Sequence, residues 1–95
     1  MGMELPRCLK VLVSGHVQGV CFRQYTHLKA LELGITGWVR NLPNGDVEAL
    51  ICGGSTQLDS MLVWLAHGPD SAQVAGIRSS PHPCDLIPDS FRISH

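Results

Sequence analysis

The sequence predicts an α+β domain in which two helices pack on one face of an antiparallel sheet. Apolar, β-branched runs and helical segments follow one another in the order β-α-β-β-α-β, with a short terminal strand. An Asn-Gly pair between the second and third strands is a strong signal for a hairpin. A split β-α-β unit of this order folds as a two-layer sandwich, the ferredoxin-like layout.

The first half of the chain supplies a strand, a loop and a helix. Leu9 to Ser14 is apolar and β-branched and predicts the first strand, which ends before Gly15. Gly15 to Cys21 contains two glycines and predicts a loop. Phe22 to Leu33 predicts a helix, because Gly34 follows it and glycine tolerates the left-handed backbone found after helices.

The middle of the chain supplies a hairpin and a second helix. Gly37 to Leu42 and Asp46 to Cys52 flank the turn and predict two antiparallel strands. Ser55 to His67 predicts a helix with one apolar stripe, and Gly68-Pro69 ends it. The stripe consists of Leu58, Met61, Leu62 and Leu65.

Two short strands complete the predicted sheet. Val74 to Ser79 predicts a fourth strand. Pro81 to Pro88 contains three prolines and predicts an irregular segment. Phe91 to Ile93 alternates in polarity and predicts a final edge strand.

Length and charge restrict the class of protein. Residues 1–95 suffice for a single domain with one core. The net charge of −1 gives no basic excess for nucleic acid, and no apolar run approaches the length of about 20 residues that spans a bilayer. The first seven residues lack the pattern of a signal peptide. We therefore expect a cytoplasmic monomer without nucleic-acid or membrane partners.

The cysteines and histidines do not predict a metal site. The four cysteines form no C-x-x-C pair, and the five histidines are scattered without ligand spacing. We expect no metal and no cofactor. In a reducing cytosol the cysteines are expected to be mostly thiols.

The segment Gly15 to Arg23 is the first candidate for chemistry. Its glycines allow successive backbone N–H groups to converge, and the helix that follows presents further N–H groups and a positive dipole end. Arg23 adds a guanidinium in the first helical turn, where its charge is unfavourable unless an anion lies between. The local pattern alone leaves an anion site and a plain strand–helix connection equally open.

Asn41 is the second candidate. The first and second strands of a split β-α-β unit are parallel, so Asn41 and the loop after the first strand lie at the same end of the sheet. Its amide both donates and accepts hydrogen bonds, which suits orienting a water molecule beside a bound anion. A purely structural asparagine at a strand end fits the local pattern equally well.

These residues carry a family resemblance. Gly15-His16-Val17-Gln18-Gly19-Val20-Cys21-Phe22-Arg23 resembles the acylphosphatase motif G-x-V-Q-G-V-x-F-R. Gly37-Trp38-Val39-Arg40-Asn41 resembles the family's G-W-V-[RK]-N, and the separation of 18 positions from Arg23 to Asn41 (41 − 23) also matches. The resemblance continues through Asn44-Gly45 and Trp64-Leu65 to Phe91-Arg92-Ile93, so it covers essentially the whole chain.

The resemblance implies a function and roles for residues. It implies hydrolysis of a small acyl phosphate to a carboxylate and inorganic phosphate, without a metal, a cofactor or a covalent intermediate. Arg23 and the backbone amides of Val17 to Phe22, in the segment from Gly15 to Arg23, would bind phosphate. Asn41 would position the attacking water, and inorganic phosphate would act as product and inhibitor.

Two other functions are possible for a domain with this predicted fold. A non-catalytic module of acylphosphatase-like fold that binds an anion or carbamoyl phosphate is the alternative, because such domains occur at the front of larger hydrogenase-maturation proteins. An RNA-binding module of ferredoxin-like fold would stack bases on aromatic side chains of its central strands. The first and third strands here carry none.

Several residues have secondary interpretations. We interpret His16 as an exposed loop residue, Cys21 as a small filler and Arg40 as a solvated charge that could approach the acyl side of the substrate. Thr26 lies one turn after Phe22, within reach of Asn41 or the loop. Trp38 and Trp64 are interpreted as core or core-edge residues, outside any stacking platform.

The expected pairing of the first and third strands brings Cys8 and Cys52 together. The first and third strands are expected to be antiparallel neighbours, with Cys8 at the start of one and Cys52 at the end of the other. Both fall on the face away from the helices if Leu9, Val11 and Val13 face inward. Opposed Cα atoms lie about 4.5–5.5 Å apart, which permits a disulfide. Two unlinked thiols on a half-exposed face fit the same arithmetic.

Overall fold

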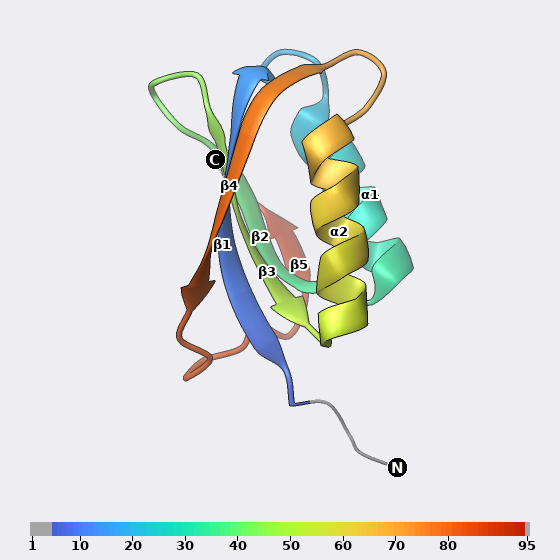
Figure 1. The fold of residues 1–95 in the computed structure, drawn as a ribbon, viewed down its shortest axis with the longest axis vertical. Coiled ribbons are helices and arrows are strands. Elements are labelled where there is room, and N and C mark those ends of the chain that lie inside the picture. Colours follow the sequence, from blue (N-terminus) through green and yellow to red (C-terminus); the bar gives the residue numbers. More distant parts are fainter. Residues whose placement is uncertain (1–4, 95) are drawn as a thin grey trace.

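The computed structural model describes residues 5–94, and all of the predicted elements are present (Figure 1). Both helices have the predicted bounds, and the hairpin strands differ from prediction by one residue at each end. In chain order the elements are β1 (Arg7–His16), α1 (Phe22–Leu33), β2 (Thr36–Asn41), β3 (Val47–Gly53), α2 (Ser55–His67), β4 (Gln73–His82) and β5 (Phe91–Ile93).

The elements form two layers. The sheet has the order β4-β1-β3-β2-β5, and both helices cover the same face of it (Figure 1). The main core lies between the layers and includes Val11 and Val13 of β1, Ala49 and Ile51 of β3 and Met61 of α2. The predicted ferredoxin-like sandwich is confirmed.

The prediction of a wholly antiparallel sheet is wrong at β5. This strand pairs with β2 in parallel, with Trp38 opposite Arg92. β4 runs opposite to β1 and therefore ends where β1 and β2 begin. Residues 83–90 cross that end of the sheet, so β5 starts there and runs in the direction of β2.

The first and fourth strands are longer than predicted. β1 continues through Gly15 and His16, which pair with Val74 and Gln73 after a register shift at Ser14/Gly15. β4 reaches His82 and includes Pro81, at the start of the segment predicted to be irregular. β4 is an edge strand, and an edge position tolerates a proline that cannot donate to a ladder.

The outer face of the sheet carries a small second cluster of buried residues. Cys8, Leu50 and Cys52 are buried there, and Trp38 packs against them. Beside them the Arg40 guanidinium lies 5.0 Å from the Trp38 ring centroid and 2.6 Å from the Glu48 carboxylate. The predicted parity of β1 and β3 is therefore confirmed.

Cys8 and Cys52 are directly opposed across β1 and β3, and the predicted register is confirmed. Their Cα atoms lie 4.2 Å apart and their sulfur atoms are joined as a disulfide. Since 44 residues separate them in sequence, the bond closes a large part of the chain into a loop. Such a crosslink restricts the unfolded chain more than the folded one.

We expect reduction of this disulfide to lower thermal stability with little change in the rate of catalysis. A crosslink of this span stabilises a fold by about 2–4 kcal/mol, so the melting temperature should fall by roughly 10 °C or more. Calorimetry and enzyme assay of oxidised and reduced protein check this. The double variant Cys8→Ser/Cys52→Ser should melt like the reduced protein and be insensitive to reductant. Equal melting temperatures in both states would contradict it.

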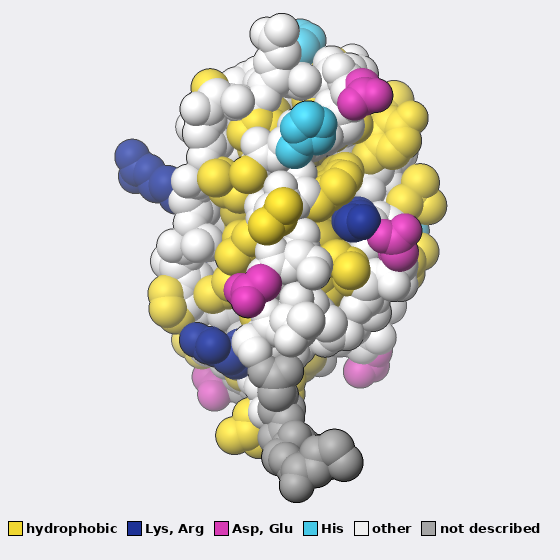
Figure 2. Space-filling model, turned by 45° about the vertical axis from the view of Figure 1, so that its right-hand side comes forward, with side chains coloured by type: hydrophobic (Ala, Val, Ile, Leu, Met, Phe, Trp, Pro, Cys, Tyr) yellow, Lys and Arg dark blue, Asp and Glu magenta, His cyan; other side chains and the backbone are white. Residues whose placement is uncertain are grey.

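The surface over the helices mixes charges of both signs. On the face that Figure 2 shows, charged side chains lie among apolar ones, some singly and some beside a side chain of opposite charge. Exposed apolar residues of the helices include Leu28, Leu31 and Val63. This face offers no block of positive charge of the kind that binds nucleic acid. Between residues 5 and 94 no helix combines the length and apolarity needed to cross a membrane.

Candidate active site

A cavity of about 270 Å³ opens at the end of the sheet where β1 and β2 both end. It is lined by the loop after β1, by the first turn of α1 and by the last residue of β2. The lining residues are Val17, Gln18, Gly19, Cys21, Phe22, Arg23, Gln24 and Asn41. The two segments singled out in the sequence therefore meet in one cavity, as the parallel course of β1 and β2 predicts.

The loop delivers an open helix N-terminus to this cavity. Gly19 has φ 74°, and Cys21 has the left-handed values φ 60° and ψ 25° immediately before α1. No side chain caps α1, and its first turn contains no acidic residue. Since the first N–H groups of a helix lack partners within the helix, an anion is well suited to bind them.

Gln18 ties the loop to the β2–β3 hairpin. Its side-chain amide donates hydrogen bonds to the carbonyl oxygens of Leu42, at 2.8 Å, and Asp46, at 2.9 Å. Leu42 directly follows Asn41, so these bonds fix the distance between the loop and the end of β2. Gln18 is predicted as part of the phosphate loop, and the structure shows that its side chain joins this loop to the hairpin.

Ser71 holds the other side of the loop. Its hydroxyl donates a hydrogen bond of 2.8 Å to the carbonyl oxygen of Val20, from the segment that joins α2 to β4. Local sequence patterns do not connect these two residues, which are 51 positions apart. The loop is thus held by hydrogen bonds to two distant segments of the chain.

Arg23 is half-buried at the cavity wall. One guanidinium nitrogen donates a hydrogen bond of 3.1 Å to the carbonyl oxygen of Ser94. The amide of Ser94 in turn donates to the Val39 carbonyl oxygen of β2, at 2.8 Å. The residue after β5 therefore helps to orient the guanidinium, so the parallel addition of β5 to β2 bears directly on the site.

Asn41 lines the cavity and has a buried side-chain oxygen atom. Its Oδ1 is buried and has no hydrogen-bond partner among the described residues. A buried carbonyl oxygen without a partner costs about 1–3 kcal/mol, which a bound water molecule in the cavity would offset. The amide is thus available to a small hydrogen-bonding molecule that lies next to the anion site.

Not every residue of the predicted phosphate loop lines the cavity. Gly15 and His16 belong to β1, where an added Cβ on Gly15 would collide with the backbone of β4. Val20 packs partly against the main core. Gln24, which the sequence analysis did not single out, lies on the cavity wall.

Three secondary interpretations can also be placed. The Thr26 hydroxyl donates to the carbonyl oxygen of Phe22 within α1, at 2.8 Å, and not to Asn41. Arg40 pairs with Glu48 on the outer face of the sheet, away from the cavity lining. Trp64 packs against Phe22 with ring centroids 5.9 Å apart, in keeping with its interpretation as a core-edge residue.

The two motif glycines have structural reasons of their own. Gly37 has φ 139°, and an added Cβ would collide with the carbonyl oxygen of Leu50 on β3. Gly15 permits the equally close approach of β4 described above. Gly15 therefore allows a close approach of two strands next to the cavity, and Gly37 allows one near the opposite end of β2.

The described residues contain no cluster that suggests a metal centre. Within residues 5–94 no group of three or more His, Cys, Asp or Glu side chains is arranged to hold a metal ion. The cavity lining itself consists of backbone, apolar side chains, one thiol, amides and the Arg23 guanidinium. This donor set suits a small oxyanion better than a cation.

Fold and cavity together define a small α+β protein with a cavity suited to an anion at the end of its sheet, and comparison with known proteins identifies the class. The acylphosphatase family model matches residues 9–93. An acylphosphatase of Vibrio cholerae is 49% identical over 72 residues, which cover 76% of this chain and 79% of the relative. The chain belongs to the acylphosphatase family.

Solved structures agree with this assignment. The acylphosphatase of Coxiella burnetii superimposes with a TM-score of 0.85 at 40% identity, covering 94% of this chain and 93% of the other. That of Bacillus subtilis gives a TM-score of 0.90 at 28% identity, covering 94% and 99%. Membership of the family supports hydrolysis of small acyl phosphates as the activity.

Proposed function

We propose that the chain hydrolyses acyl phosphates in the cavity at the end of β1 and β2, with Arg23 and Asn41 as catalytic residues. One observation carries the assignment of roles. An uncapped helix N-terminus, Arg23 and Asn41, whose Oδ1 has no partner among the described residues, lie at the same cavity. The first two features suit a phosphoryl group, and the third suits a water molecule.

The phosphoryl group is bound by the loop and Arg23. Backbone N–H groups at the start of α1 and the forked donors of the guanidinium bind its oxygens. Charge that develops on these oxygens in the transition state meets donors that are already in place. The hydrogen bonds of Gln18, Ser71 and Ser94 keep the loop and Arg23 in position before substrate binds.

Asn41 orients the water molecule that attacks phosphorus. The bond from phosphorus to the acyl oxygen breaks, a new phosphorus–oxygen bond forms, and the carboxylate leaves. No carboxylate, imidazole or amine side chain is among the described residues that line the cavity. The proton of the water therefore passes to a phosphate oxygen of the substrate, which is sufficient because a carboxylate is a good leaving group.

The proposal extends to the organisation of the protein. All of the described site residues come from one chain, so we propose a monomer that works as a single domain, residues 1–95, in the cytoplasm. Arg23 is the sole charged side chain among the described lining residues, so the site binds phosphate without selecting one acyl group. Inorganic phosphate should compete with substrate because it fits the same donors.

A substrate panel tests the function. We expect purified protein to hydrolyse benzoyl phosphate and acetyl phosphate at least about 100-fold faster than phosphate monoesters, because only the acyl compounds have an activated leaving group. The panel is run with and without EDTA, and equal rates are expected. The measurement is release of inorganic phosphate.

Each arm of the panel can overturn a different part of the proposal. Comparable or faster turnover of monoesters would exclude acylphosphatase specificity. Loss of activity in EDTA, restored by zinc or magnesium, would exclude the metal-free mechanism. Tight binding of phosphate or carbamoyl phosphate without turnover would instead support a non-catalytic binding module.

A further inference from the structure

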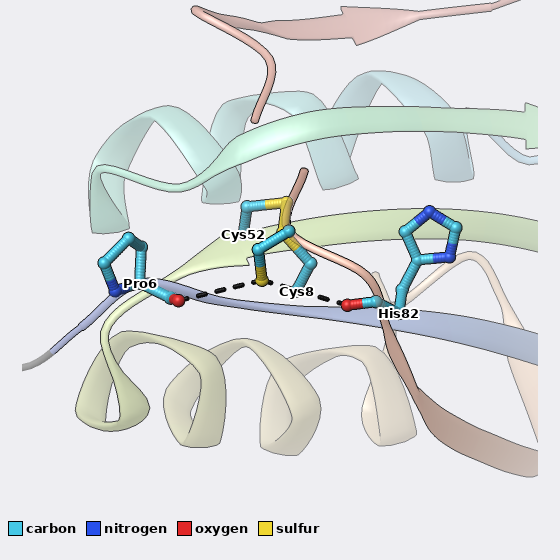
Figure 3. Close-up of a disulfide and its surroundings, with 5 residues drawn as sticks. Pro6, Cys8, Cys52 and His82 are labelled. Carbon is cyan, nitrogen blue, oxygen red and sulfur yellow. Dashed lines mark hydrogen bonds between the residues drawn. A yellow bond between two sulfur atoms is a disulfide. The ribbon is translucent and has the colours of Figure 1, made fainter. Parts of the chain in front are cut away.

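A third cysteine lies near the disulfide, at the end of the sheet opposite the cavity. Cys8 and Cys52 are joined there and are only 3% and 2% exposed. Cys84 is an exposed free cysteine. Its thiol is hydrogen-bonded to the carbonyl oxygens of Pro6, at 3.7 Å, and His82, at 3.8 Å, which the dashed lines in Figure 3 mark.

The sheet register places this thiol next to Cys8. On one side Cys8 is opposite Cys52 of β3, and on the other side it is opposite His82 of β4. Pro6 precedes Cys8 by two residues. The Cys84 thiol thus bridges the segments that flank Cys8 along β1 and across to β4, and Figure 3 shows these segments converging at the disulfide.

The burial of the disulfide poses a problem of access. Thiol–disulfide exchange requires a thiolate to reach a sulfur atom directly. Cys8 and Cys52 are only 3% and 2% exposed, so a tripeptide such as glutathione has little room to reach their sulfur atoms. Cys84 can meet such a reagent at the surface, and it lies where exchange with Cys8 requires only a local movement of residues 83–90, which form no strand or helix.

We propose that Cys84 is an exchange site through which small thiols and disulfides oxidise and reduce the Cys8–Cys52 pair. In oxidation, the Cys84 thiolate attacks glutathione disulfide, forms a mixed disulfide and releases one glutathione thiolate. The Cys8 thiolate then attacks the Cys84 sulfur and releases the second glutathione. Finally the Cys52 thiolate attacks the Cys8 sulfur, which forms the Cys8–Cys52 bond and returns Cys84 as a thiolate.

The net reaction consumes one glutathione disulfide and yields two glutathione thiols, and reduction is the reverse sequence. Because Cys84 is regenerated, it changes the rate of exchange and leaves the equilibrium unaltered. The free energy that the disulfide contributes to the fold can then respond to the thiol pool without unfolding of the protein. The proposal does not depend on the catalytic roles proposed for Arg23 and Asn41.

Cys21 supplies a matched control within the same chain. It is also an exposed free cysteine, so it reacts with the same reagents. It lies in the loop beyond the other end of β1, whereas Cys8 is the second residue of that strand. Eight residues of strand span about 26 Å, so Cys21 cannot exchange with the Cys8–Cys52 pair in the folded protein.

The test measures how fast the disulfide forms. Reduced wild-type protein, Cys84→Ser and Cys21→Ser are exposed to oxidised glutathione, quenched with an alkylating reagent and mapped by mass spectrometry. We expect Cys84→Ser to form the Cys8–Cys52 bond at least about tenfold more slowly than wild type, because the exposed thiol that reacts first with glutathione disulfide is lost. Cys21→Ser should match wild type, and all three should reach the same oxidised fraction at equilibrium in a glutathione buffer.

A second variant traps the intermediate. In Cys52→Ser the last exchange step is blocked, so a Cys8–Cys84 disulfide should accumulate. Equal rates for wild type and Cys84→Ser would overturn the proposal, since glutathione would then reach the buried pair directly. A Cys52→Ser protein that carries glutathione on Cys84 while Cys8 stays reduced would overturn it as well.

Discussion

Arg23→Gln is expected to lower kcat/KM for an acyl phosphate by at least about 100-fold, equivalent to about 2.7 kcal/mol of lost transition-state stabilisation. The guanidinium belongs to the first turn of an uncapped helix, at the wall of the cavity that Asn41 also lines. Glutamine keeps one amide donor but loses the charge and the forked geometry that suit two phosphate oxygens. Steady-state kinetics on benzoyl phosphate measure the change.

Arg78→Gln is the matched control for this result. Arg78 is exposed on β4 and does not line the cavity. Its substitution by glutamine therefore removes the same unit of charge without changing the cavity lining. Its activity should stay within about twofold of wild type, since an isolated surface charge contributes little. Inhibition by inorganic phosphate should weaken in Arg23→Gln together with the rate. An Arg23→Gln protein that keeps more than half of the wild-type turnover would rule out the proposed role.

Thermal melting distinguishes catalytic loss from misfolding. The Arg23 hydrogen bond to Ser94 contributes at most a few kcal/mol to the fold, because a hydrogen bond to a charged donor is worth about 1.5–3 kcal/mol. The variant should therefore remain folded at 25 °C. We expect the folded variant to keep its main core intact and to unfold cooperatively, although its activity is lost.

Local signals predicted the framework of the fold and the place of the site. The Asn-Gly turn and the apolar stripe of α2 gave the hairpin and helix nearly to the residue, because both depend on short-range geometry. Alternation along β1 and β3 gave the register that pairs Cys8 with Cys52, since a shift by one residue would turn every apolar side chain outward. Parallel β1 and β2 then brought the loop and Asn41 together.

The errors occur where distant segments decide the structure. Proline interrupts most strands because it lacks an N–H group. Pro81 is tolerated because β4 is an edge strand, where the missing N–H group is not needed. The direction of β5 follows from the path of residues 83–90 around the sheet, which short-range patterns do not encode. The hydrogen bonds of Gln18, Ser71 and Arg23 span 24 to 71 residues, so only the folded chain reveals them.

Asn41→Ala is expected to lower kcat by about 100-fold while inhibition by phosphate changes less than about threefold. Its proposed partner is the attacking water, and an interaction that matters on the way to the transition state affects turnover more than ground-state binding. The contrast with Arg23→Gln, in which rate and phosphate binding should fall together, separates the two roles. Kinetics and phosphate inhibition of both variants provide the measurement.

The stability of Asn41→Ala supplies an independent criterion. Oδ1 of Asn41 is buried without a partner among the described residues, so removing it should not lower the melting temperature. A structural asparagine would behave oppositely and would destabilise the fold when truncated. Asn44→Ala, at an exposed hairpin position outside the cavity lining, is the matched control. It should leave kcat within about twofold of wild type, because the Asn44 side chain is hydrogen-bonded to Asp46 within the hairpin. Parallel collapse of rate and phosphate affinity would make Asn41 a binding residue, and unchanged kcat would remove it from the mechanism.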